Sequence, residues 1–184
     1  MLTKNFLKIE KEMIIEASKK NEQINIIAKE LELSSKLVVD GVDFKLIGKI
    51  DRVDLKGDTL RIIDYKTGNV EQGELSFTEF NELIDDPKKS KVFQLLMYSY
   101  LYLKNYPQHM GSNIIAGNFS FKNLKSGLLK VSHKINRKES KILIIDQNIL
   151  NNFEVQLKTV LSRINKNPFA KIPHIKNCEW CDYK

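Results

Sequence analysis

The chain has 184 residues and a formal net charge of +7, with 30 Lys and Arg against 23 Asp and Glu. This length suits a single domain over residues 1–184, which we expect to be a piece of a longer chain. Without a run of about 18 apolar residues or a signal-peptide core, a membrane or secreted protein is not indicated, and we expect a cytoplasmic one.

The excess of basic residues favours a polyanionic partner without establishing one. Only two cysteines are present, Cys178 and Cys181, so a disulfide framework is not indicated. Their C-x-x-C spacing is half of a zinc or iron–sulfur site, because such a site needs four ligands. We therefore expect no iron–sulfur cluster in this chain.

The N-terminal segment is predicted to be an amphipathic helix over residues 2–17, because its apolar residues recur at helical spacing. A continuation through Ile24 and Ile27 to Leu31, with a break near Asn21, stays open. The acidic residues of the helix are interpreted as solvated side chains rather than ligands: Glu10, Glu12 and Glu16.

Three strands are predicted next, over residues 32–39, 42–55 and 59–66, joined by the turns at Asp40-Gly41 and Lys56-Gly57-Asp58. Alternation places Asp64 and Lys66 on one face of the third strand, at the end of an apolar row. Burying charge is costly unless it is paired or bound, so this placement indicates a functional site.

A second carboxylate is available on the preceding strand. Asp51 and Asp54 point to opposite faces there, and spacing alone does not decide which of them joins Asp64. Two acids and a lysine are the minimum for metal-assisted hydrolysis of a phosphodiester, in which acids hold Mg²⁺ and lysine offsets phosphate charge. A surface ion pair near the turn at Thr67-Gly68 is the alternative interpretation.

A buried helix is predicted over residues 92–103, which are apolar nearly all round. Asp86-Pro87 marks a boundary before it, and Pro107 ends it. Gln94 is the polar exception, and Tyr98 lies one turn further on the same face. The lysines that open the helix either contact DNA phosphates or form a solvated helix start: Lys88, Lys89 and Lys91.

A second hairpin is predicted from residues 113–121 and 127–133 around the turn 122–126, followed by a core-packing helix over residues 147–165. Residues 122–141 form the most basic segment, with one acid, Glu139. We interpret it as a DNA-backbone contact, or alternatively as a solvated sheet edge. Its basic residues are Lys122, Lys125, Lys130, Lys134, Arg137, Lys138 and Lys141.

Three strings of residues, G-K-I-D-R-V-D (48–54), I-I-D-Y-K-T-G (62–68) and F-Q-L-L-M-Y (93–98), resemble the PD-(D/E)xK nuclease superfamily. Within it, they are similar to the RecB-like nuclease domains of helicase-nucleases such as RecB and AddB. The resemblance covers roughly residues 41–106. It implies that Asp51, rather than Asp54, is the acid that joins Asp64. It implies an α/β restriction-endonuclease-like fold with a central mixed sheet flanked by helices.

The resemblance also implies the roles of the site residues. Asp51, Asp64 and Lys66 would be catalytic, with Gln94 and Tyr98 lining the site. The metal, Mg²⁺ or Mn²⁺, would be held by Asp51, Asp64 and the backbone carbonyl of Tyr65. Family members add a histidine or glutamate from an upstream helix. No histidine precedes His109 here, so either that helix lies outside this chain or a glutamate substitutes.

The implied function is Mg²⁺-dependent hydrolysis of DNA, as an exonuclease that processes DNA ends in recombinational repair. A helicase domain or subunit would be its partner, besides DNA itself. The chief alternative is a catalytically inactive DNA-binding module of a helicase-nuclease complex, and a second is a stand-alone site-specific endonuclease.

Overall fold

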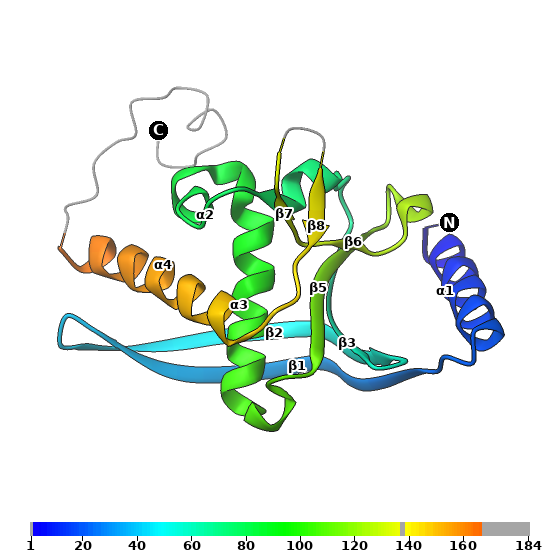
Figure 1. The fold of residues 1–184 in the computed structure, drawn as a ribbon, viewed down its shortest axis with the longest axis horizontal. Coiled ribbons are helices and arrows are strands. Elements are labelled where there is room, and N and C mark those ends of the chain that lie inside the picture. The colour runs from blue at the N-terminus through cyan, green and yellow to red at the C-terminus, as the bar shows by residue number, and fades with distance from the viewer. Residues whose placement is uncertain (1, 137–138, 167–184) are drawn as a thin grey trace.

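The computed structural model describes residues 2–136 and 139–166 (Figure 1). Its helices and strands are α1 (Leu2–Lys19), β1 (Ile24–Val39), β2 (Val42–Lys56), β3 (Thr59–Lys66), β4 (Ser76–Phe77), α2 (Glu82–Asp85), α3 (Ser90–Asn105), β5 (Asn113–Ser120), β6 (Leu129–Lys130), β7 (Ser132–Lys134), β8 (Ser140–Ile142) and α4 (Gln147–Lys166). Short 3₁₀ helices lie between them: η1 (Gln72–Leu75), η2 (Pro87–Lys89), η3 (Pro107–His109) and η4 (Leu124–Ser126).

A five-stranded sheet in the order β1-β2-β3-β5-β6 forms the centre of the molecule. The β3 and β5 strands pair in parallel and the other neighbours are antiparallel, so the sheet is mixed. Figure 1 shows α3 across the long β1–β2 hairpin, α4 beside it, and α1 at one end of the molecule. The expected α/β architecture, a central mixed sheet flanked by helices, is confirmed.

One apolar cluster joins the sheet to α3 and α4. Its members include Ile50, Ile62, Leu96 and Phe153, each fully shielded from solvent. Burial of such a side chain contributes roughly 1.5–3 kcal/mol relative to its exposure, which makes this cluster the main support of the sheet. None of the helices in the described ranges is long and apolar enough to cross a membrane.

The first helix does not continue to Leu31, a possibility that the sequence had left open. The helix ends at Lys19, Asn21 has a positive φ of 55°, and the chain enters β1 at Ile24, opposite Lys56. Asparagine tolerates this left-handed conformation, which commonly ends helices. The isoleucines that follow are β-branched and favour an extended chain, and their pairing with β2 decides the outcome.

The second predicted hairpin is confirmed at β5 and β6, which pair antiparallel through Gly117 and Asn118. Its second strand is shorter than expected, because the chain leaves β6 after Lys130. Residues Ser132–Lys134 then pair with β4 and β8 in a separate three-stranded sheet. Strand β8 was not predicted.

A buried ionic cluster lies on the face of the sheet that α1 covers. Asp54 accepts hydrogen bonds from Arg61 Nε at 2.6 Å and Arg52 Nε at 2.7 Å, and all three residues are buried. Glu10 of α1 pairs with Arg52 and is only 21% exposed, so the expectation that it is a solvated side chain is wrong. The cluster ties α1 to β2 and β3.

Replacement of Asp54 by Asn should destabilise the fold by about 3–5 kcal/mol, because two buried guanidinium groups lose a shared counter-ion. The free energy of unfolding in urea measures the effect. Asp43→Asn is the matched control, since Asp43 is exposed and should change stability by less than about 0.5 kcal/mol. Equal stability of the two variants would contradict a structural role for the cluster.

Candidate active site

The candidate site begins where two strands of the hairpin stop pairing. The β2–β3 ladder runs from Lys56 and Thr59 to Arg52 and Ile63, and ends there. Beyond this point the Tyr65 N–H donates to Asp51 Oδ2 at 2.7 Å. The Asp51 carboxylate thus accepts the hydrogen bond that the Tyr65 N–H would otherwise donate to a main-chain oxygen of β2. This contact fixes Asp51 against β3.

Asp64 and Lys66 lie on one face of β3, as alternation predicted. The ammonium of Lys66 is 2.9 Å from Asp64 Oδ2. It also donates to Gln94 Oε1 at 2.7 Å, and Gln94 Nε2 in turn donates to the Tyr98 hydroxyl at 2.8 Å. An ammonium has three N–H donors, so one of them remains available at Lys66.

The absence of a side chain at Gly48 lets α3 lie close to β2 beside this site. A Cβ at Gly48 would be 2.7 Å from Leu101 Cδ1 and 3.4 Å from Tyr98 Cδ1. The first of these separations is shorter than van der Waals contact, so any other residue would require the Leu101 side chain to shift.

The structure therefore brings together the five side chains that the sequence singled out as catalytic. Hydrogen bonds and an ion pair connect Asp51, Asp64, Lys66, Gln94 and Tyr98, with the backbone of Tyr65 between them. Asp54 lies on the opposite face, within the ionic cluster. Of the two acids that spacing could not separate, Asp51 is the one beside Asp64.

Sequence reasoning missed Asn118, which is the register partner of Asp64 on β5. Its Nδ2 donates to Asp64 Oδ2 at 2.7 Å and to the Asp64 main-chain oxygen at 3.2 Å. Asn118 is 0% exposed, and its Oδ1 is buried without a hydrogen-bond partner in the described ranges. An amide in the middle of a mostly apolar strand was the available signal, but it does not reveal which strand lies alongside.

Each of the two carboxylates keeps one oxygen unused. The donors from Lys66 and Asn118 both reach Oδ2 of Asp64, and Tyr65 N–H reaches Oδ2 of Asp51, whereas neither Oδ1 accepts a hydrogen bond from the described residues. Mg²⁺ binds through one or two carboxylates and retains several waters. Two free carboxylate oxygens on neighbouring strands fit this requirement.

No cluster of three His, Cys, Asp or Glu that could hold a metal occurs in residues 2–136 and 139–166. Glu10, one of the glutamates that could have served as the upstream ligand, is engaged by Arg52 on the other face. The ligand set that the resemblance implies, Asp51, Asp64 and the backbone carbonyl of Tyr65, therefore stays a prediction.

Burial and neighbouring charges shift the pKa values of two groups at the site. Burial raises the pKa of the Asp64 carboxyl, and the charge of Asp51 adds to this rise, against the opposing effect of Lys66. Burial likewise raises the pKa of Tyr98; the hydrogen bond from Gln94 opposes this, and the two carboxylates add to it. Two carboxylates and one ammonium lie together here, so the formal charge of the group is negative and a divalent ion would offset it.

The lysines expected to contact DNA differ in their surroundings. Lys89 is buried, and its ammonium donates to the main-chain oxygens of Ser76 at 2.6 Å and Gly73 at 3.3 Å. Lys91 lies 2.5 Å from a carboxylate oxygen of Glu74. Three others are exposed and make no ion pair within the described part of the chain: Lys88, Lys122 and Lys125.

The family model of the PD-(D/E)XK nuclease superfamily matches residues 2–184, and the chain belongs to this superfamily. Its nucleases generally use divalent metal ions. Among solved structures the chain is similar to the crystal structure of SSO0001, at 13% identity and a TM-score of 0.41 over 84% of this chain, and it covers 56% of the length of that protein. No curated protein matches the sequence.

Asn118→Ala should lower the affinity for Mn²⁺ by roughly 10–100-fold, because the donor that orients a ligand carboxylate is removed. Isothermal titration of the protein with Mn²⁺ measures this change. Asn113→Ala provides the control, since Asn113 lies at the far end of β5 and its side chain donates to the Thr59 hydroxyl. Unchanged Mn²⁺ affinity in the folded Asn118 variant would show that Asp64 does not need this donor.

Proposed function

We propose that the protein is a divalent-metal-dependent deoxyribonuclease that hydrolyses phosphodiester bonds. The observation that carries this proposal is the joint position of Asp51, Asp64 and Lys66, with one unused oxygen on each carboxylate. Membership in a nuclease superfamily supports the reaction class. Two carboxylates and a lysine are the groups that metal-assisted hydrolysis requires, and this supports the mechanism.

In this mechanism Asp51 and Asp64 would hold Mg²⁺ or Mn²⁺, with the backbone carbonyl of Tyr65 as a third ligand. The cation, when bound, supplies charge stabilisation at the phosphate and lowers the pKa of a water. Tyr65 N–H and Asn118 keep the two carboxylates oriented from behind. Most of the rate gain then comes from positioning and electrostatics.

Lys66 acts next to the scissile phosphate. Its third N–H orients the attacking water and offsets the charge that develops on the phosphate oxygens. Gln94 restrains the ammonium from the α3 side, so the lysine does not collapse fully onto Asp64. Tyr98 holds the Gln94 amide and keeps its own hydroxyl proton to donate toward the substrate.

The motif strings support a finer assignment. The arrangement of D-Y-K followed by Q-x-x-x-Y is that of RecB- and AddB-like nuclease domains, which implies exonucleolytic processing of DNA ends in recombinational repair beside a helicase domain or subunit. A cytoplasmic location follows from the same role. Lys88, Lys122 and Lys125 are the candidates for backbone contacts, because their ammonium groups are free of ion pairs in the described ranges.

A DNA-binding module without catalytic activity is the second candidate. It is favoured by one observation, that no third acidic or histidine ligand joins Asp51 and Asp64 among the described residues. Retention of Lys66 in an ion pair with Asp64 favours the nuclease instead. Cleavage and binding assays on the same DNA separate the two.

Lys66→Ala should lower the rate of DNA cleavage by about 10²–10³-fold in Mg²⁺ or Mn²⁺, because an electrostatic stabiliser of the transition state is removed. Cleavage of labelled linear DNA measures the rate, and Lys45→Ala, an exposed lysine on β2, is the control. Equal cleavage by the parent and Lys66→Ala proteins would remove the catalytic assignment. Linear and covalently closed circular substrates distinguish exonuclease from endonuclease, since an exonuclease needs an end.

Gln94→Leu should reduce kcat more than it changes KM, because Gln94 positions Lys66. A loss of about 10-fold is expected, smaller than that of Lys66→Ala, since the lysine is still present. Tyr98→Phe removes only the outer member of this chain of hydrogen bonds and should have the smallest effect. A rise in KM at constant kcat would instead assign Gln94 to substrate binding.

A further inference from the structure

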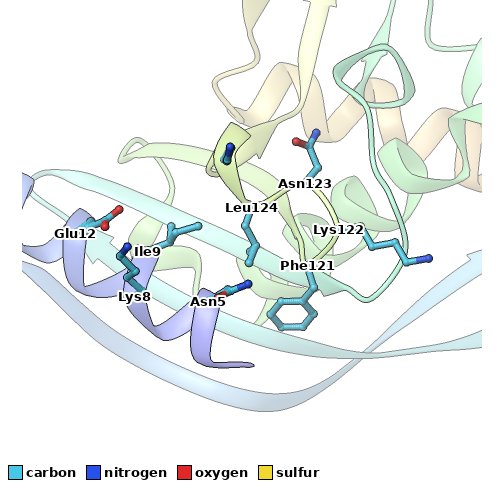
Figure 2. Close-up of a pocket in the computed structure, with 9 residues that line it drawn as sticks. Asn5, Lys8, Ile9, Glu12, Phe121, Lys122, Asn123 and Leu124 are labelled. Atoms are coloured by element: carbon cyan, nitrogen blue, oxygen red, sulfur yellow. The ribbon is translucent and has the colours of Figure 1, made fainter. Parts of the chain in front are cut away.

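A cleft of about 460 Å³ lies between α1 and the segment around η4 (Figure 2). Ile9 of α1 and Phe121 and Leu124 of the facing segment supply its apolar lining, and lysines lie around it. Figure 2 shows Leu124 directed into the space beside α1, whereas Lys122 extends away from α1 on the far side.

The cleft carries an excess of positive charge. Its lining includes Lys8, Lys122 and Lys125 but a single acid, Glu12. All three lysines are exposed, and none of them makes an ion pair within the described part of the chain. Lys91, by contrast, has its charge neutralised by Glu74. Lys8 and Lys125 lie at the cleft itself, and Lys122 extends from its rim on the side away from α1. Unpaired ammonium groups along such a surface suit a polyanion.

The cleft is joined to the candidate active site through the backbone. Lys66 and Ser120 are the last paired residues of β3 and β5. Phe121 follows Ser120, and its N–H donates to the main-chain oxygen of Lys66 at 2.9 Å. The Phe121 ring also stacks with that of Tyr65, at a centroid separation of 6.0 Å and an interplanar angle of 11°. The cleft therefore starts where β3 and β5 end, on the side of the sheet opposite Asp64.

This placement lets one extended strand contact both features. A strand cleaved beside Lys66 would leave the site over the ends of β3 and β5 and reach the cleft next. Lysines would contact its phosphates, and the apolar lining would lie against sugars and bases. A nucleic-acid strand fits better than an acidic protein segment, because every nucleotide carries a phosphate beside apolar sugar and base surfaces.

We propose that this cleft binds the backbone of the DNA strand adjacent to the cleaved bond, through Lys8, Lys122 and Lys125. The proposal rests on the proposed nuclease function for its substrate and adds a second binding site, contributed partly by α1. It predicts that the strand is bound without base selectivity, because phosphate contacts carry no sequence information.

The test uses a fluorescently labelled single-stranded oligonucleotide without divalent metal, so that binding is measured apart from cleavage. The triple variant Lys8→Ala, Lys122→Ala, Lys125→Ala should reduce the slope of log K against log salt by about 2, because each lysine bound to a phosphate contributes roughly 0.7 to that slope. Affinity near 100 mM salt should fall roughly 10- to 100-fold. The matched control replaces Lys29, Lys36 and Lys45 by Ala, which are exposed lysines on β1 and β2 outside the cleft.

Each outcome decides the proposal. A reduction of affinity and slope confined to the cleft variant supports it, whereas equal slopes for the cleft and control variants, or no binding by the parent, overturn it. Cleavage of the same oligonucleotide in Mg²⁺ tests the nuclease function separately. If the parent cleaves the oligonucleotide but the cleft and control variants have equal salt slopes, only the proposed binding role of the cleft is rejected. If the cleft variant loses affinity but the parent does not cleave, only the nuclease function is rejected. Thermal unfolding of all three proteins checks that they are folded.

Discussion

The end of hydrogen bonding between β2 and β3 is the feature on which the candidate site depends. Up to Arg52 and Ile63 the two strands satisfy each other's backbone groups, and beyond them Asp51 accepts the Tyr65 N–H instead. A continued ladder would have left the Asp51 carboxylate without this anchor. Because a backbone donor cannot be moved by side-chain rotation, Asp51 is held more firmly than a carboxylate bound only by another side chain.

The two faces of β3 perform different tasks within three consecutive residues. Asp64 and Lys66 face α3 and form the site, whereas Tyr65 faces α1, where its ring contacts Phe6 at a centroid distance of 5.3 Å and its hydroxyl accepts from Arg52. The α1 helix thus supports the strand from behind without approaching the carboxylates. This arrangement supports the strand of the candidate site from its other face.

The sequence predicted what depends on near neighbours. Alternation along residues 59–66 placed Asp64 and Lys66 together, and alternation along residues 42–55 placed Asp51 and Asp54 on opposite faces. The turn at Gly57 predicted the hairpin, because turn chemistry is a local property. The end of the first helix was not predictable in this way. Residues 24–31 are compatible with either a helix or a strand, and pairing with β2, a contact distant in sequence, decides between them.

The partners of charged groups were beyond sequence reasoning for the same reason. Lys89 and Lys88 are adjacent and chemically identical, yet one ammonium is buried against the main-chain oxygens of Ser76 and Gly73 and the other is exposed. Asn118 lies 54 residues from Asp64 and meets it only because β5 pairs in parallel with β3. A lysine or amide in the sequence is therefore only a candidate, and the groups that it reaches in the fold decide whether its charge is available to a phosphate or used to build the protein.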